Sequence, residues 1–130
     1  MQLLGLRTTI YPVTDLEAAK SWFTKLVGRP PYFDRPFYVG YEVGGYELGL
    51  DPNADPELGV QSYWGVADAA AAVAEMTDFG ATVLSDAHEV GDGIRIAKLK
   101  DPFGNLIGII ENPAFELRPD ANAENPGPGR

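Results

Sequence analysis

The stretch Asp101-Pro102-Phe103-Gly104-Asn105-Leu106-Ile107-Gly108 decides how the second half of the chain folds. It joins two apolar segments, residues 94–99 and 106–110, whose β-branched and aliphatic side chains are typical of strands. Proline followed by glycine between such segments favours a tight turn. We therefore predict that the two segments pair as a hairpin around the turn.

The first half of the chain predicts the same elements in the same order. Gly44-Gly45 is typical of a two-residue hairpin loop, here between residues 37–43 and 46–51. In each half a predicted strand and then a predicted helix come before the hairpin, and in the second half a further short strand is expected at residues 81–84, between the helix and the hairpin. We expect the first helix to begin at the capping box Thr14-Asp15-Leu16-Glu17 and the second at Asp68. The repeated order indicates an α+β fold built from two βαβββ modules, each of about 55 residues.

The composition argues against several classes of function. Of the 130 residues 10 are basic and 19 are acidic, so the net charge is −9 and we expect neither nucleic acid nor an anionic membrane as a partner. No apolar run is long enough to span a membrane, and the first residues lack the pattern of a signal peptide, so we expect a cytoplasmic location. The absence of cysteine excludes thiolate metal sites. The one histidine, His88, is expected in a connection before the strand at residues 94–99.

Two stretches of the sequence resemble one protein superfamily. Val13-Thr14-Asp15-Leu16-Glu17-Ala18-Ala19 with Trp22-Phe23, together with the turn and strand at residues 101–108, are similar to the vicinal oxygen chelate superfamily. That superfamily includes glyoxalase I, extradiol dioxygenases, fosfomycin-modifying enzymes and bleomycin-resistance proteins. The resemblance implies two tandem βαβββ modules that form a barrel-shaped mixed sheet with the helices outside. It also implies a homodimer.

The same resemblance divides the chain. It implies a single domain over residues 1–115, with one module at residues 3–53 and the other at residues 58–113. Residues 116–130 end in a run of proline and glycine, and we expect them to form a flexible tail.

Metal-dependent members of the superfamily hold a divalent cation with side chains from the first and last strands of each module. The matching positions in this chain are Thr8 or Arg7, Gln61, Gly49 and Gly108. Glycine has no side chain to donate, and a threonine hydroxyl or a guanidinium is a poor ligand. One amide does not hold a divalent ion. We therefore expect no metal and no other cofactor.

Strand alternation places several polar and aromatic side chains on the concave face of the predicted sheet. The strand at residues 94–99 is ambiguous, because Arg95 and Lys98 lie on opposite faces of it. The expected ligand-binding residues are Tyr38, Glu42, Glu47, Asp51, Gln61, Tyr63, Arg95 and Lys98. The glycines among them are expected to leave room for a small molecule, unless larger neighbours fill the gaps.

Two of these carboxylates are expected to lie directly opposite each other. A two-residue loop at Gly44-Gly45 pairs Glu42 with Glu47, and like charges in such a pair repel. Exposure of both carboxylates to water, protonation of one of them, or a nearby cation from the second module or from a ligand would relieve the repulsion. We expect Glu47 to be the main candidate for a functional residue.

Three functions fit these features. The preferred one is a metal-independent binding protein, similar to the bleomycin-resistance branch, for a small molecule that the acidic surface favours as a cation. The alternative is an enzyme similar to lactoylglutathione lyase or to the dioxygenases, with Glu47 or Asp51 as base and Arg95 or Lys98 as stabiliser. The third is a dimerisation scaffold without a ligand.

Overall fold

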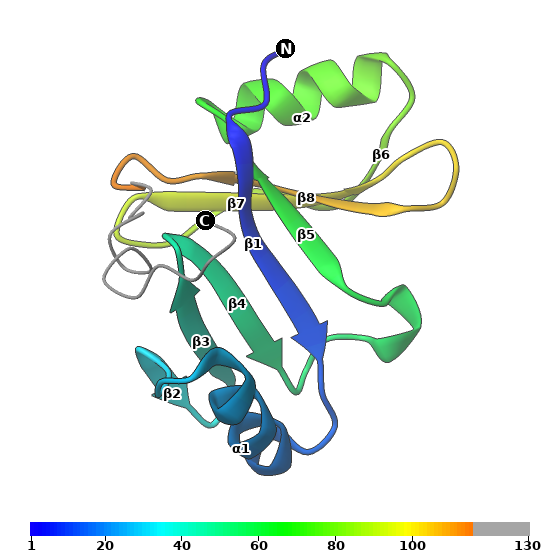
Figure 1. Cartoon of the computed structure of the whole chain (residues 1–130). Coiled ribbons are helices and arrows are strands. Elements are labelled where there is room, and N and C mark those ends of the chain that lie inside the picture. Colours follow the sequence, from blue (N-terminus) through cyan, green and yellow to red (C-terminus); the bar gives the residue numbers. More distant parts are fainter. Residues whose placement is uncertain (116–130) are drawn as a thin grey trace, which may run out of the picture. The chain divides into compact units, whose positions relative to one another are not determined.

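The computed structural model describes residues 1–115, and the predicted tail at residues 116–130 lies outside that range. The chain is a mixed α+β protein, and the βαβββ order occurs twice, as predicted (Figure 1). The first module consists of β1 (Gly5–Pro12), α1 (Leu16–Val27), β2 (Phe33–Arg35), β3 (Tyr38–Val43) and β4 (Tyr46–Asp51). After the short 3-10 helix η1 (Pro56–Leu58), the second consists of β5 (Gln61–Gly65), α2 (Ala69–Asp78), β6 (Thr82–Gly91), β7 (Ile94–Lys100) and β8 (Leu106–Glu111).

The eight strands of the described part follow the order β2-β3-β4-β1-β5-β8-β7-β6. Internal contacts divide these residues into two compact units. We call residues 9–60 the N-terminal unit, and residues 1–8 with 61–115 the C-terminal unit. No helix among residues 1–115 is long and apolar enough to cross a membrane.

The core of the N-terminal unit lies between α1 and the β3–β4 hairpin. Val39, Tyr41 and Leu50 are fully buried there. The Tyr41 hydroxyl lies 2.8 Å from Oγ1 of Thr24 and donates to the carbonyl of Lys20, so a polar group inside this core is satisfied by α1.

The start of α1 differs from the predicted capping box. Asp15, not Thr14, is the N-cap, because its Oδ1 accepts the backbone N–H of Ala18 at 3.0 Å. The predicted end is confirmed: Gly28 has a φ of 87°, which glycine adopts without strain, and donates its N–H to the Thr24 carbonyl.

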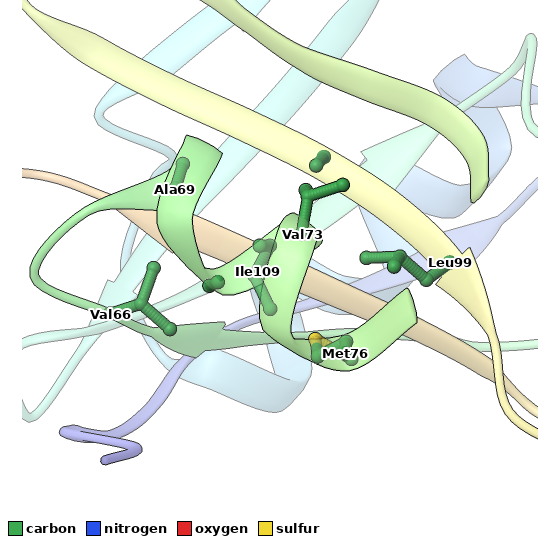
Figure 2. Packing of buried hydrophobic residues seen from close by; sticks show 8 residues of the cluster. Val66, Ala69, Val73, Met76, Leu99 and Ile109 are labelled. Carbon is green, nitrogen blue, oxygen red and sulfur yellow. The ribbon is translucent and has the colours of Figure 1, made fainter. Parts of the chain in front are cut away.

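The core of the C-terminal unit lies between α2 and the sheet. Figure 2 shows Val73 and Met76 of α2 beside Leu99 of β7 and Ile109 of β8. The predicted N-cap Asp68 is confirmed, since it accepts the N–H of Ala71 at 3.0 Å. These contacts identify the face of the C-terminal unit that the helix covers, and thereby the face that it leaves uncovered.

The turn at residues 101–105 joins β7 and β8, as predicted. Oδ1 of Asp101 accepts the backbone N–H groups of Phe103 and Asn105, each at 2.8 Å, and Oδ2 accepts the Asn105 amide at 2.9 Å. The hydrogen bonds from Asn105 hold the pKa of Asp101 below its usual value.

The strand before that hairpin is longer than the short strand and connection expected for this region. β6 extends over Thr82–Gly91 and contains His88, so the prediction of a connection at His88 is wrong. The pairing of β6 with β7 shifts register at three points. Such bulges interrupt the regular alternation of side chains, which is the signal that a strand leaves in a sequence.

Candidate functional site

The β3–β4 hairpin brings two carboxylates face to face in the N-terminal unit. Val43 pairs with Tyr46 across the Gly44-Gly45 loop, and Glu42 pairs with Glu47, as predicted. Glu47 is partly buried, and phenolic hydroxyl groups reach both of its oxygens. Tyr32 donates to Oε1 at 2.8 Å and Tyr38 donates to Oε2 at 2.5 Å.

These hydrogen bonds stabilise the charge of Glu47, whereas the sequence predicted exposure to water, protonation or a nearby cation. They are charge-assisted, and so stronger than bonds between neutral groups. Tyr32 was absent from the predicted site residues, because it precedes β2 in the sequence and no local pattern aims it at β4. The backbone places it there: the N–H of Tyr32 donates to the carbonyl of Gly40 at 3.0 Å.

The ring of Tyr38 reaches Glu47 by crossing a glycine. A Cβ on Gly49 would lie 2.0 Å from the Tyr38 hydroxyl oxygen and 2.6 Å from its Cζ. The expectation of free space at this glycine is therefore wrong, because the tyrosine fills it. Gly49 serves here as the position beside which the hydroxyl end of Tyr38 can lie.

The pKa values of both phenolic hydroxyl groups are raised. Loss of hydration raises the pKa of Tyr38 and of Tyr32, and the charge of Glu47 raises it further, because ionisation would place two negative charges side by side. The pKa of Tyr38 is raised more than that of Tyr32, because Tyr38 is more deeply buried and Tyr32 is 62% exposed. Each phenol therefore remains a hydrogen-bond donor well above neutral pH.

This arrangement predicts a specific loss of stability in alkali. The pKa of Tyr38 is higher in the folded state than the value of about 10 in an unfolded chain, so its contribution is complete below pH ~10 and is lost as the pH rises further. We expect the free energy of unfolding to fall above that pH by at most ~1.4 kcal/mol per unit on account of Tyr38. Urea unfolding should show a shallower fall for Tyr38→Phe than for the wild type. Equal slopes would contradict the Tyr38–Glu47 contact.

On the face of the C-terminal unit that α2 leaves uncovered, the ring of Tyr63 packs over a glycine of β8. A Cβ on Gly108 would lie 2.6 Å from Cδ2 of Tyr63, so the Tyr63 ring covers that glycine. Tyr63 and Gln61 are 4% and 3% exposed, and their side chains face each other, with the Tyr63 hydroxyl 3.4 Å from Oε1 of Gln61. Both predicted residues are thus buried together.

The structure also resolves which face each side chain of β7 occupies. Ala97 and Leu99 are fully buried in the core beneath α2, so Arg95 shares the helix-covered face, where it pairs with Glu111. Lys98 lies on the opposite face and pairs with Gly108. Of the two predicted cations, Lys98 therefore shares a face with Tyr63, and Arg95 does not.

Arg7, an alternative to Thr8 at the first-strand metal position implied by the resemblance, has a defined place in the C-terminal unit. Its guanidinium carbon lies 3.8 Å from the centre of the Phe115 ring. On the side of Gly65, a Cβ would lie only 2.7 Å from its Nε. Arg7 therefore lies close over a glycine and stacks against an aromatic ring.

The positions at which the resemblance implies metal ligands do not fit a divalent ion. Gly49 lies beneath the ring of Tyr38 and Gly108 beneath the ring of Tyr63. The first-strand candidates are a buried threonine, Thr8, and the stacked cation Arg7. Residues 1–115 also contain no group of three or more His, Cys, Asp or Glu side chains placed to hold a metal ion.

A sequence model of the Glyoxalase/Bleomycin resistance protein/Dioxygenase superfamily matches residues 5–109. The chain belongs to this superfamily, as its resemblance predicted. No curated protein matches the sequence.

Solved structures share the fold at low sequence identity. A methylmalonyl-CoA epimerase from Streptomyces coelicolor, in complex with 2-nitronate-propionyl-CoA, is 22% identical with a TM-score of 0.68, over 88% of this chain and 99% of that one. A superfamily member from Vibrio splendidus 12B01 is 19% identical with a TM-score of 0.60, over 82% and 99%. The Mn(II)-bound glyoxalase from Novosphingobium aromaticivorans is 16% identical with a TM-score of 0.69, over 90% of this chain and 42% of that one.

Proposed function

We propose that this chain is a metal-independent binding protein for a small organic cation, and that Glu47 recognises the positive charge. The observation that carries the proposal is the pair of phenolic hydrogen bonds to Glu47. They hold a carboxylate in one orientation on the face of the β3–β4 hairpin that α1 leaves uncovered. A charge that is already oriented loses less conformational freedom when a ligand binds.

Aromatic rings beside Glu47 support the choice of a cation. The Phe33 ring centre lies 6.5 Å from that of Tyr32, 6.1 Å from that of Tyr38 and 6.0 Å from that of Phe37. Tyr32 and Phe37 are 62% and 58% exposed, so ring surface next to the carboxylate remains accessible. Aromatic faces together with a negative charge are the usual recognition chemistry for alkylammonium groups.

Two observations favour binding without a metal and without turnover. Tyrosine rings cover the two last-strand glycines, where metal-dependent relatives carry ligands. Both oxygens of Glu47 already accept hydrogen bonds, so the carboxylate is better prepared to hold a positive charge than to remove a proton from a substrate. The cytoplasmic location, the homodimer, and the roles of Glu42 and Asp51 as further contacts remain predictions.

Choline and its uncharged carbon isostere, 3,3-dimethylbutan-1-ol, test the proposal by calorimetric titration. We expect choline to bind and its isostere to bind at least about tenfold more weakly, because the two differ only in charge. Glu47→Gln retains the shape of the side chain and removes its charge, so it should lose choline affinity by a similar factor. Treatment with a chelator should change nothing.

A matched control removes a charge elsewhere in the same unit. Glu57→Gln affects an exposed residue of η1 and should leave choline affinity unchanged. Equal affinity of wild type and Glu47→Gln for choline would contradict the role of Glu47. A stoichiometric divalent ion in protein purified without chelator would contradict metal independence, and catalytic turnover of a bound molecule would support the enzymatic alternative.

A further inference from the structure

Three strands of the C-terminal unit, β5, β7 and β8, place charged side chains of only positive sign on its uncovered face. β5, β7 and β8 contain one acidic residue, Glu111, which lies on the helix-covered face and accepts the N–H of Ala69 at 2.9 Å. In β7 the side chains of Ala97 and Leu99 point into the core beneath α2. The alternating residues Lys98 and Lys100 therefore lie on the uncovered face. In a chain of net charge −9, it is distinctive that β5, β7 and β8 place two lysines and no carboxylate on this face.

Arg7 adds a third and better oriented cation to this face. It lies over Gly65, which alternation places on the same side of β5 as Tyr63. The only hydrogen bond of its guanidinium within residues 1–115 is a long one of 3.5 Å to the carbonyl of Leu4. No ion pair of the described residues includes Arg7 or either lysine.

The contacts of Arg7 leave the edge of its guanidinium available. Stacking on Phe115 occupies one flat side of the group and the Gly65 backbone limits the movement of the side chain. The N–H groups of an arginine point outward in the plane of the guanidinium, and their fork matches the two oxygens of a carboxylate. A stacked arginine therefore presents its donors in a fixed direction.

Beside Arg7, this face offers apolar side chains that could contact the hydrocarbon part of an organic carboxylate. Gly65 lies in one row with Ile110 of β8 and Ile96 of β7, and both isoleucines are only partly buried. Lys98 lies in the next row with Gly108 and Tyr63. The row that begins beneath Arg7 is thus aliphatic, with a lysine beside it.

We propose that this face binds an amphipathic organic carboxylate, whose charged group pairs with Arg7 and whose apolar part lies on Ile96 and Ile110. Lys98 and Lys100 raise the local positive potential. The site lies within the C-terminal unit and uses no residue of the Glu47 site, so it goes beyond the function proposed above and does not depend on it.

Hexanoate, with hexanamide as its uncharged counterpart, is the probe. Amide chemical shifts of isotope-labelled protein should move with hexanoate for residues of β5, β7 and β8, with at least about tenfold weaker binding for hexanamide. Arg7→Gln should weaken hexanoate binding at least tenfold. Arg7→Lys should weaken it less, since it keeps the charge and loses the fork. Gly65→Ala should also weaken it, because the new methyl group displaces the guanidinium and leaves its charge in place.

The controls separate this proposal from general charge effects and from the Glu47 site. Lys25→Gln removes one positive charge from an exposed position of α1 and should leave hexanoate affinity unchanged. Glu47→Gln should also leave it unchanged, and choline affinity should survive in Arg7→Gln, so either proposal can fail alone. Absence of hexanoate binding, equal binding of hexanamide, or unchanged affinity in both Arg7 variants would overturn the proposal. Tighter binding of inorganic phosphate than of hexanoate would overturn the assignment to carboxylates.

Discussion

Gly108→Ala is expected to lower the free energy of unfolding by about 1–3 kcal/mol, the usual cost of overpacking a closed site. The added methyl group would lie 2.6–2.8 Å from three atoms of the Tyr63 ring. Those atoms include Cγ at the base of the ring, and Tyr63 is only 4% exposed, so the ring cannot move aside easily. Urea unfolding of the purified variant measures the loss.

A double-mutant cycle shows whether the Tyr63 ring is the cause. Tyr63→Ala alone should cost about 3–5 kcal/mol, because it removes a large buried side chain. In that background the clash is gone, and Gly108→Ala should be neutral or stabilising by up to about 1 kcal/mol, since alanine restricts the unfolded chain more than glycine does. Equal effects of Gly108→Ala in the two backgrounds would show that Tyr63 does not cover the glycine.

Gly49→Ala is expected to destabilise the N-terminal unit, also by about 1–3 kcal/mol. Its methyl group would lie 2.0 Å from the Tyr38 hydroxyl oxygen, so the ring must swing away and its hydrogen bond to Glu47 must break. Glu47 would then lose one of its two phenolic donors while it still lies opposite Glu42. The variant should also lose the alkaline effect predicted for Tyr38.

Removal of the ring again gives the control. In a Tyr38→Ala background, Gly49→Ala should cost nothing or stabilise slightly, for the same reason as at Gly108. A Gly49→Ala variant as stable as the wild type, with the alkaline effect intact, would contradict the position of the Tyr38 ring. The two glycines test one idea, that a tyrosine side chain fills the space beside the glycine in the last strand of each module.

A glycine at a ligand position excludes coordination from that position, which the sequence already implies. It does not follow that the position is empty space. At Gly49, Gly65 and Gly108 a ring or a guanidinium occupies the volume that a Cβ would need. The faces that remain for a ligand are therefore lined by tyrosine and arginine.

Local patterns predicted several features correctly because short-range chemistry determines them. The Gly44-Gly45 loop sets the register of its hairpin, and the register puts Glu42 opposite Glu47. The first helix shows the limit of such patterns. Thr14 and Asp15 are both good N-caps, and the choice between them depends on which side chain reaches a free N–H once the backbone has entered the helix.

The sequence by itself determined the superfamily, the duplicated βαβββ order, the opposed carboxylates and the absence of suitable ligands at the expected metal positions. Each of these depends on residue type, on turn chemistry or on a spacing along the chain. Only the tertiary structure decided that Tyr32 and Tyr38 hold Glu47, that Arg7 stacks on Phe115, and that Lys98 rather than Arg95 lies on the face that α2 leaves uncovered. The reason is physical: these contacts join residues distant in sequence through long side chains, whose direction depends on which face of each strand the helices cover and on which neighbour lacks a Cβ.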